Sequence, residues 1–379
     1  MSDSLSSLYG GRGIALDYGK GSRVFDTNGR EYIDFLNGHG AMLFGHADPV
    51  LTAALEEAAR HVWSGGAGLD SPVRDELAEE LSSIVGGNGR VFLTNSGTEA
   101  IEAAIKLAVS INPKRPRILA CRRAFHGRTC GALSVTFNPK YKTPFGNFIA
   151  KAEHYNPEDL AAHIDENVAA VFMEPVQGEG GVFPIAPEIG RAVSEACAKN
   201  GAILIADEVQ TGLGRCGAIL ASPLAGMSPD ITCVAKGLAG GLPAGAAIWK
   251  KELGDFPSHS HGSTYGGNEL VARVAIAALK HIRNDKLTEH AKSFGEFLRA
   301  RLAKIDSPVI KEIRGLGLLN GIELEIPSLE VIRPLQENGV LALAAGPRVL
   351  RFLPSFAATE RDGEEAAVKL EKTLKEISK

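Results

Sequence analysis

Short apolar runs rich in β-branched residues recur along this chain of 379 residues, with helical patterns between several of them. The runs do not alternate with polar residues, which predicts strands buried on both faces, as in a largely parallel sheet. A chain organised in this way is expected to have an α/β fold, with the sheet between helices. The predicted strands are 90–94, 117–121, 169–175, 202–208, 230–236 and 244–250, and the predicted helices are 72–84, 98–110, 157–165 and 187–200.

One of these helices is predicted to begin at Ser96. The segment "SGTE" matches a capping box, in which Ser96 is the N-cap residue and Glu99 follows three residues later. Glu102 and Lys106 can pair on the exposed face of this helix. An apolar stripe on the opposite face consists of Ile101, Ala104, Ile105 and Ala108.

The pattern changes after about residue 268. Two long helices, 268–283 and 287–304, are predicted there, followed by a few strands and a final amphipathic helix. The apolar face of that last helix carries Ala367, Leu370, Leu374 and Ile377. The predicted domains are an N-terminal segment (1–45) that packs with the small domain, a large domain (46–267) and a small C-terminal domain (268–379).

The composition excludes several classes of protein. With 44% hydrophobic and 23% charged residues, the chain can bury a large core, and its net charge of −4 with mixed signs argues against a nucleic-acid-binding protein. The N-terminus has neither a basic start nor an apolar core segment, and no run of about 18 apolar residues occurs. We expect a soluble, cytoplasmic protein that binds no membrane.

The five cysteines include no C-x-x-C pair and no cluster typical of a metal site. Several lie within apolar strand or helix patterns. We therefore expect reduced core cysteines in a cytosolic protein, and no bound metal. They are Cys121, Cys130, Cys197, Cys216 and Cys233.

Polar groups follow several of the predicted strands directly. In open parallel sheets, ligands bind at the carboxyl ends of the strands. The segment from Asn95 to Thr98 opens a capped helix and predicts an anion site suited to a phosphate. The other groups at strand ends are Glu174, Asp207, Glu208 and Lys236.

Each of these features alone has an ordinary structural explanation, as a helix start, a loop cap or an exposed lysine. The stretch "GLGRCG" (212–217) also matches G-x-G-x-x-G, which would suggest an NAD-type oxidoreductase. That match is weak, because "EVQT" separates the glycines from the strand and no acidic residue follows about 20 positions later. The combination of a phosphate site, a lysine and an aspartate is far more specific.

Pyridoxal 5′-phosphate requires all three groups. Its aldehyde condenses with a lysine amine, its phosphate needs anion ligands, and its ring nitrogen must stay protonated. Burial favours the neutral amine that attacks the aldehyde, which explains a lysine at the end of an apolar strand. Lys236 is therefore predicted to be the Schiff-base lysine. The small residues after it, which leave room for the cofactor and substrate, are Gly237, Ala239, Gly240 and Gly241.

The chain resembles the class-III (subgroup II) pyridoxal-phosphate aminotransferases, and within them most closely the acetylornithine aminotransferases. The resemblance runs from 24–49 to 349–355 and depends on motifs that are specific as a set. It implies the fold-type-I architecture, with a mainly parallel seven-stranded sheet between helices and a smaller α/β domain. The motifs are "TNSGTEA", "AFHGRT", "EPVQGEGG", "ADEVQTGLGR", "AKGLAGG" and "GSTYGGN".

The resemblance also implies how the cofactor is held. Phe125 stacks on the pyridine ring, Asp207 forms a salt bridge with the ring nitrogen, and Gln210 lies near the ring hydroxyl. Thr264 is expected to reach the phosphate bound to the neighbouring subunit, which implies at least a homodimer. The residues expected to hold the phosphate within the chain are Ser96, Gly97 and Thr98.

For the substrates, the resemblance implies two arginines with different roles. Arg128 is expected to bind the α-carboxylate of the amino donor through its guanidinium fork. Arg351 is expected to be a switch arginine, which Glu179 masks while the ω-amine donor is bound and releases to hold 2-oxoglutarate. Glu174 supports the site from behind. The expected reaction is a ping-pong transfer from N-acetylornithine to 2-oxoglutarate, within arginine or lysine biosynthesis.

Other donors stay open at this stage, namely carrier-linked lysine or ornithine, free ornithine and 4-aminobutyrate. His126 favours the acetylornithine type, because ornithine δ-aminotransferases carry tryptophan there. His39 and the glycine-rich segment 62–72 depart from the family pattern near the expected substrate entrance. A catalytically silent cofactor-binding regulator is disfavoured, because Lys236 and Asp207 are both present and no DNA-binding segment is appended.

Overall fold

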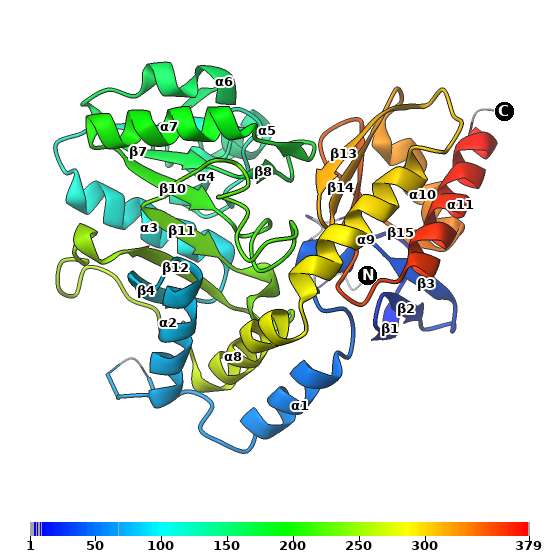
Figure 1. Ribbon diagram of the computed structural model, residues 1–379, viewed down its shortest axis with the longest axis horizontal. Helices are drawn as coiled ribbons and strands as arrows, with labels where there is room; N and C mark the ends of the chain where they lie inside the picture. The colour runs from blue at the N-terminus through cyan, green and yellow to red at the C-terminus, as the bar shows by residue number, and fades with distance from the viewer. Residues whose placement is uncertain (1–3, 5, 7, 9, 67, 378–379) are drawn as a thin grey trace.

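The computed structural model of the chain describes residues 4, 6, 8, 10–66 and 68–377. Its central element is a seven-stranded sheet with the strand order β4-β12-β11-β10-β7-β5-β6 (Figure 1). Every neighbouring pair is parallel except the two pairs that involve β12. The α/β fold with a mainly parallel seven-stranded sheet is therefore confirmed. The strands are β4 (Gly89–Thr94), β5 (Arg117–Cys121), β6 (Glu153–Tyr155), β7 (Val168–Met173), β10 (Ile203–Asp207), β11 (Ile231–Val234) and β12 (Gly245–Lys250).

Helices cover both faces of this sheet. Along β7 and β10, successive side chains point to opposite faces, so that Phe172 and Ile205 pack with α3 (Gly97–Ile111), whereas Val171 and Leu204 join a separate core cluster. Val193 and Cys197 of α7 (Pro187–Asn200) belong to that second cluster. Burial on both faces explains why these strands read as continuous apolar runs.

Most predicted helices are present, but the prediction for 157–165 is wrong as one helix. The segment forms a single turn, α6 (Pro157–Leu160), followed by the 3₁₀ turn η3 (Ala161–His163). Ile164 has extended backbone angles, and a turn from Asp165 to Val168 then leads directly into β7. The short distance to the next strand leaves no room for a longer helix.

Two smaller four-stranded sheets contain the rest of the strands. In the first, β3 of the N-terminal segment pairs in parallel with β15 near the other end of the chain. This pairing agrees with the predicted packing of the N-terminal segment against the small domain, although the domain bounds stay a prediction. The strands are β1 (Leu16–Lys20), β2 (Arg23–Asp26), β3 (Glu31–Asp34) and β15 (Val340–Leu341) in one sheet, and β13 (Ile310–Leu316), β14 (Leu319–Leu324), β17 (Val349–Phe352) and β16 (Leu343–Ala344) in the other.

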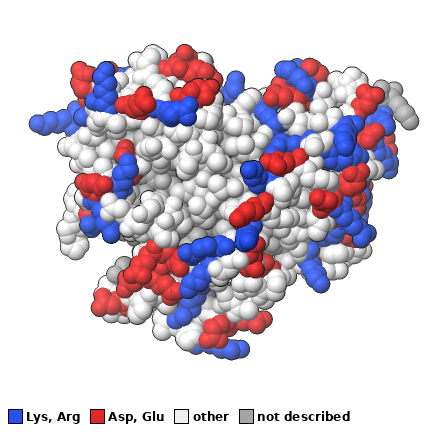
Figure 2. All heavy atoms as spheres, in the orientation of Figure 1, with Lys and Arg blue, Asp and Glu red and all other residues white. Residues whose placement is uncertain are grey.

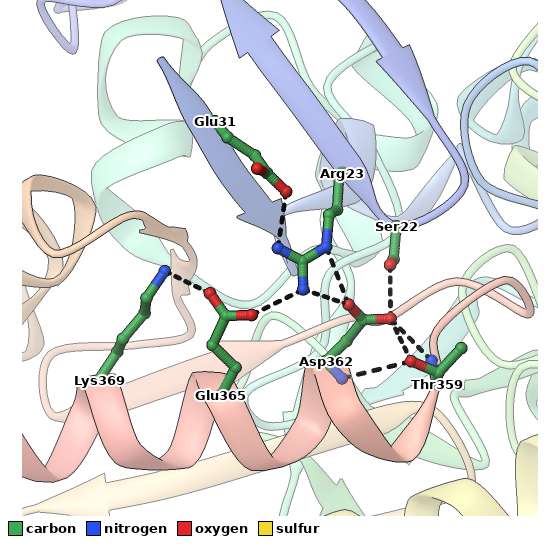
Figure 3. Close-up of polar contacts among 7 residues, drawn as sticks. All are labelled: Ser22, Arg23, Glu31, Thr359, Asp362, Glu365 and Lys369. Carbon is green, nitrogen blue, oxygen red and sulfur yellow. Dashed lines mark hydrogen bonds and ion pairs between the residues drawn. The ribbon is translucent and has the colours of Figure 1, made fainter.

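A network of charged groups also joins the N-terminal segment to the last helix, α11 (Glu360–Ile377) (Figure 3). Arg23 on β2 contacts Asp362 and Glu365 of α11 at 2.7 Å each. The hydroxyl of Ser22 donates a hydrogen bond of 2.9 Å to Asp362, which also accepts from the backbone N–H of Thr359 at the start of the helix. Asp362 therefore stabilises the helix start and the contact with β2 together.

The first helix of the predicted small domain, α8 (Glu269–Asn284), lies against the larger part of the molecule. It packs on α1 (Pro49–Ala58), α2 (Pro72–Ile84) and the turn η4 (Lys236–Ala239), and Figure 1 shows it beside α1 and α2. The remaining elements are η1 (Asn37–Gly40), α4 (Cys130–Val135), α5 (Pro139–Lys142), η2 (Thr143–Phe145), β8 (Val176–Gln177), β9 (Phe183–Pro184), η5 (Lys251–Leu253), α9 (Leu287–Leu302) and α10 (Ser328–Glu337).

The structure tests the expectations for the cysteines, the surface charge and membrane-spanning helices. All five cysteines have free thiols, but Cys130 is exposed at the start of α4, where its position in a short helix after a loop leaves it outside the core. That part of the core prediction is wrong. In Figure 2, lysine and arginine lie next to aspartate and glutamate in mixed groups around a broad area without charged residues. No helix among the described residues combines the length and apolar character needed to span a bilayer.

Candidate active site

The segments that follow several strands of the large sheet meet in one cavity of about 400 Å³. β4 leads to Ser96, β7 to Glu174, β10 to Asp207 and β11 to Lys236. The structure therefore brings these four groups together, as expected for an open parallel sheet. Glu208 does not line the cavity, and its carboxylate accepts hydrogen bonds from Thr211 and Ser222 instead. The predicted site residues that line the cavity are Ser96, Gly97, Thr98, Phe125, Arg128, Glu174, Glu179, Asp207, Gln210 and Lys236.

The first turn of α3 forms one end of the cavity. Ser96 is the N-cap residue, and its hydroxyl accepts a hydrogen bond of 3.3 Å from the backbone N–H of Glu99. The carboxylate of Glu99 reaches back to the backbone N–H of Asn95 at 2.6 Å, one residue earlier than in a standard capping box. A Cβ atom on Gly97 would lie 2.5 Å from Val209, so only glycine fits. The free N–H groups of a helix start suit an anion here.

Lys236 follows β11 after one residue, Ala235, and is the first residue of the turn η4. Its backbone has a φ of +44°, a left-handed conformation that is uncommon for a residue with a side chain. Burial lowers the pKa of Lys236 to about 8, and Glu179 and Asp207 oppose this shift in part. About a tenth of this amine is therefore neutral at pH 7, far more than for an exposed lysine, and the neutral form is the nucleophile.

Asp207 is held by two donors. Its Oδ1 accepts a hydrogen bond of 3.0 Å from the backbone N–H of Val209, and its Oδ2 lies 2.7 Å from Nδ1 of His126. Both side chains are buried. Because a carboxylate only accepts hydrogen bonds, the proton of this contact lies on Nδ1 of the imidazole. The sequence analysis did not foresee this role of His126, which contacts Asp207 from the loop after β5.

Arg351 and Glu179 form an ion pair behind the cavity. Nη2 of Arg351 lies 2.5 Å from Oε1 of Glu179, and the guanidinium is 1% exposed whereas the carboxylate is 34% exposed. Burial alone would raise the pKa of Glu179, but Arg351 and Lys236 reverse the shift and lower it. The pair therefore keeps its charges, and its carboxylate faces the cavity while its arginine is enclosed.

Arg351 also orients Gln210. Its Nη1 donates a hydrogen bond of 3.0 Å to Oε1 of Gln210. Gln210 lines the cavity. Its amide nitrogen is buried and has no hydrogen-bond partner among the described residues. An unpaired buried donor of this kind is rare, and it is free to bond with a ligand in the cavity.

Glu174 connects two loops at the cavity wall. Its carboxylate accepts hydrogen bonds from the backbone N–H groups of Phe125 at 2.9 Å and Gly178 at 3.2 Å. Burial raises the pKa of Glu174, and the nearby Asp207 adds to this effect. Glu174 thus fixes the loop that carries Phe125 relative to the loop that carries Glu179, which agrees with the supporting role predicted for it.

Arg128 lies at the exposed rim of the same cavity. Its guanidinium stacks on aromatic rings and forms no ion pair or hydrogen bond with any described residue. The two predicted substrate arginines therefore differ in their state, because Arg351 is paired and enclosed whereas Arg128 is free and open to solvent.

Thr264 does not line the cavity. It is exposed in the loop before α8, while its neighbour Ser263 accepts a hydrogen bond of 3.2 Å from the side chain of Asn95. The loop thus contacts the segment before Ser96, and Thr264 itself faces outward. This placement leaves its predicted contact with a neighbouring subunit as a prediction.

The two departures from the family pattern lie outside the residues that line the cavity. His39 is in a left-handed turn, and burial lowers its pKa, with Arg351 and Lys236 adding to the effect and Glu179 opposing it. In the segment 62–72, residue 67 is outside the described part of the chain, and Trp63 is 61% exposed. Their effect on the choice of substrate stays a prediction.

The glycines of "GLGRCG" have a structural role. A Cβ atom on Gly214 would lie 2.8 Å from the ring of Phe356, and one on Gly217 would lie 3.0 Å from Lys292. Arg215 between them is buried and donates to the backbone carbonyls of Gly40 and Pro354. These glycines allow the loop to pack against the C-terminal part of the chain, which leaves no open cradle for a dinucleotide.

The residues of the cavity fit pyridoxal 5′-phosphate. They offer an anion site at the start of α3, a lysine whose pKa is lowered, a buried carboxylate at Asp207 and an unpaired amide donor at Gln210. The start of α3 suits the phosphate of the cofactor, and the lysine suits its aldehyde. Asp207 suits the ring nitrogen, and the amide of Gln210 suits the ring hydroxyl. Gly127 is also required beside them, because a Cβ atom there would collide with the side chain of Thr98.

Comparisons with known proteins agree with this assignment. The family model described as "Aminotransferase class-III" matches residues 10–374. Acetylornithine aminotransferase of Bacillus subtilis is 39% identical over 377 residues, covering 98% of this chain and 97% of that protein. LysW-aminoadipate semialdehyde transaminase of Deinococcus radiodurans is 38% identical over 381 residues, covering 98% and 89%. The crystal structure of ornithine aminotransferase from Toxoplasma gondii superposes with a TM-score of 0.93 at 33% identity, covering 99% of this chain and 93% of that chain.

Proposed function

We infer the reaction of this protein from its family: the chain belongs to the class-III aminotransferases, and it is a transaminase that uses pyridoxal 5′-phosphate. Its relatives support an activity on the ω-amino group of the donor. The proposed donor is N-acetylornithine, and the proposed acceptor is 2-oxoglutarate, with a semialdehyde and glutamate as products. The single observation that carries this proposal is the contrast between the paired Arg351 and the unpaired Arg128 at one cavity.

The contrast matches what the two half-reactions require. An ω-amine donor brings an amine to the reacting centre and a carboxylate at a distance from it, so it needs a free guanidinium at the rim. 2-Oxoglutarate brings a carboxylate directly beside the reacting carbon. We assign the first carboxylate to Arg128 and the second to Arg351, which Glu179 neutralises until the acceptor arrives.

When bound, the cofactor supplies an aldehyde that condenses with amines and a ring that takes up electrons from the substrate carbon. Lys236 holds the cofactor in the resting enzyme, and its neutral Nζ then moves the proton at the substrate carbon as a general base and acid. Asp207 keeps the ring nitrogen protonated, and Phe125 and Gln210 orient the ring. Ser96, Gly97 and Thr98 bind the phosphate.

The reaction is proposed to follow a ping-pong order, because the same cavity serves both substrates in turn. The protein is proposed to act as a homodimer, with Thr264 of one subunit at the phosphate of the other, and to work in the cytoplasm in arginine or lysine biosynthesis. The loop containing Ser263 lies beside the phosphate site, which makes this edge suitable for a shared site.

A second candidate donor is carrier-linked lysine or ornithine. The relative from Deinococcus radiodurans is named for a LysW-linked substrate, and its identity to this chain is close to that of the acetylornithine enzyme from Bacillus subtilis. The exposed position of Arg128 at the rim is compatible with a donor whose far end stays outside the cavity. Free ornithine and 4-aminobutyrate are the remaining alternatives.

A panel of ω-amino donors tests the proposal. Each donor is mixed with purified protein, cofactor and 2-oxoglutarate, and glutamate is measured over time. The panel contains N-acetylornithine, ornithine, 4-aminobutyrate and lysine linked to a carrier protein. The highest kcat/KM is expected for N-acetylornithine, and Lys236→Ala serves as the inactive control. A higher value for any other donor would replace the proposed substrate, and no glutamate with any donor would remove the proposed acceptor.

A further inference from the structure

Arg128 and two aromatic side chains form a small cluster at the rim of the cavity. The central carbon of the Arg128 guanidinium lies 3.6 Å from the centroid of the Tyr141 ring and 5.6 Å from that of Phe125. The two rings are 6.2 Å apart and nearly perpendicular, with an angle of 88°. At 3.6 Å, a guanidinium that pointed an edge at the ring would bring its nitrogen atoms into steric overlap with the ring carbons, so its plane lies along the face of Tyr141.

Stacking on Tyr141 leaves the N–H groups of the Arg128 guanidinium free. The N–H groups of a guanidinium point outward in its own plane, so a ring beneath the plane occupies none of them. Arg128 has no ion pair or hydrogen bond with any residue that the structure describes. The fork is therefore held in place and open to a planar, bidentate ligand, for which a carboxylate is the matching group.

The stack also limits the motion of a long, flexible side chain. An unattached arginine at an exposed rim samples many rotamers and loses that freedom when it binds a ligand. A ring at contact distance restricts it beforehand, so part of this cost is avoided at binding. Arg351 is restricted in a different way, by burial and by its bonds to Glu179 and Gln210.

Tyr141 is itself attached to the fold. Its backbone N–H donates to the carbonyl of Asn138 within the short turn α5, and the neighbouring Lys142 donates a hydrogen bond of 2.8 Å to the carbonyl of Ser134 in α4. The start of α4 is fixed by the carboxylate of Glu102 on α3, at 2.7 Å from the backbone N–H of Gly131. The ring beneath Arg128 therefore belongs to a connected piece of structure that begins at the phosphate-binding helix.

We propose that Tyr141 is a positioning residue that gives the enzyme its preference for donors with a carboxylate far from the reacting amine. It acts through Arg128, whose guanidinium it holds flat and open at the rim. The inference rests on the proposed role of Arg128 in donor binding. It adds that the aromatic face of Tyr141, and not its hydroxyl, is the feature that matters.

The test compares donors with and without the carboxylate. Four ω-amino acids are each paired with their decarboxylated counterpart: N-acetylornithine with N-acetyl-1,4-diaminobutane, ornithine with 1,4-diaminobutane, 4-aminobutyrate with 1-aminopropane, and free lysine, in place of the carrier-linked form, with 1,5-diaminopentane. The variants are Tyr141→Leu, which removes the ring, and Tyr141→Phe, which keeps the ring without the hydroxyl. Tyr141→Met repeats the test if circular dichroism shows that the leucine variant is not folded. Phe137→Leu is the matched control, because this ring lies beneath Arg122, which does not line the cavity.

For Tyr141→Leu, kcat/KM for the carboxylate donor should fall about 3- to 30-fold, mainly through KM, while the value for its decarboxylated counterpart changes less than about twofold. Tyr141→Phe and Phe137→Leu should keep the wild-type ratio between the two donors. In an Arg128→Gln background, Tyr141→Leu should have no further effect on this ratio, since the two residues act as one unit.

Several results would overturn the inference. They are an equal loss on both members of a pair, an unchanged ratio in Tyr141→Leu, the same effect in Tyr141→Phe, or additive effects with Arg128→Gln. The failure of the proposed donor looks different, because the wild type then prefers another of these four pairs. The comparison within that pair still tests Tyr141. A wild type that prefers the decarboxylated member of every pair would count against Tyr141 and Arg128 together.

Discussion

His126 and Asp207 form a buried pair whose atoms Nδ1 and Oδ2 are 2.7 Å apart. The pair links the loop after β5 to the end of β10, so two separate segments determine how the carboxylate points. With the backbone N–H of Val209 on its other oxygen, Asp207 has a fixed orientation before any ligand binds. Its charge is thus directed at one point in the cavity, as electrostatic catalysis requires.

Replacing Asp207 should separate cofactor binding from turnover. Asp207→Asn removes the negative charge with little change in volume, so the cofactor should still bind while kcat falls by at least about 10²–10³-fold. His126→Phe keeps the charge and removes one charge-assisted hydrogen bond, for which a fall of about 10- to 100-fold is expected. Absorbance of the bound cofactor and single-turnover rates measure the two effects separately.

His154→Phe is the control for this pair. His154 bonds to the backbone carbonyl of Val135 and does not line the cavity, so its loss should leave kcat nearly unchanged. Turnover of Asp207→Asn close to that of the wild type would refute the role of the carboxylate.

Removing Glu179 should shift the balance between the two substrates. In Glu179→Ala, Arg351 has no carboxylate partner, so glutamate should gain as an amino donor and the ω-amine donor should lose. A partly buried, charge-assisted pair can redistribute about 1.5–3 kcal/mol between substrates. The absorbance change of the cofactor in each half-reaction measures both substrates independently.

Glu312→Ala provides the comparison, because Glu312 is an exposed partner of a different arginine, Arg314. It should leave both half-reactions as they are. If Glu179→Ala slows both half-reactions by the same factor, the switch does not exist and Glu179 has only a structural role.

The uptake of cofactor should report the pKa of Lys236. Only the neutral amine attacks the aldehyde, and burial lowers the pKa of Lys236 to about 8. The rate of uptake by cofactor-free protein should therefore rise about tenfold per pH unit below pH 8 and level off above it. Stopped-flow absorbance between pH 6.5 and 9.5 measures the profile, and borohydride followed by peptide mapping should locate the cofactor on Lys236.

A rate that still rises tenfold per unit at pH 9.5 would mean that the amine has the pKa of an exposed lysine. An adduct on any other lysine, or a colourless protein that cannot be reconstituted, would exclude Lys236 as the attachment site. Lys236→Met supplies the baseline, in which no covalent adduct should form.

Mixed dimers should show whether Thr264 serves the neighbouring subunit. One chain carries Thr264→Ala and the other Lys236→Ala, and two affinity tags isolate the mixed species. With sharing, one site has both defects and the other has neither, so activity per lysine-bearing chain should be retained in full, which is about half that of a wild-type dimer. A mixed dimer without activity would show that Thr264 acts within its own chain.

Much of the site follows from the sequence because it depends on strand ends. Lys236 and Asp207 come directly after apolar runs, and parallel strands deliver the residues that follow them to one edge of the sheet. The helix start at Ser96 is likewise a local pattern. In such cases the physical cause lies within a few residues of the functional group.

The features that could not be predicted depend on contacts between distant segments. The hydrogen bond from His126 to Asp207 joins residues that are 81 positions apart, and Tyr141 reaches Arg128 only through the packing of two short helices. The apolar pattern does not predict the strand β6, because its three residues are half-buried and polar and form no apolar run. The helix predicted at 157–165 was shortened by the nearby start of β7, which the helical pattern does not reveal.

The contacts that join the N-terminal strands to the C-terminal part of the chain affect how the chain folds during its synthesis. Arg23 and Asp362 are 339 positions apart. β3 pairs with β2 on one side, but its other edge pairs with β15, so that edge has no partner until Val340 and Leu341 have been synthesised. Contacts between such distant positions are formed slowly. Until then this edge of β3 is open to other extended chains, and its pairing with β15 ends that exposure. A strand more than 300 residues further along the sequence, β15 at Val340–Leu341, thus determines when the edge of β3 at Glu31–Asp34 is protected from aggregation.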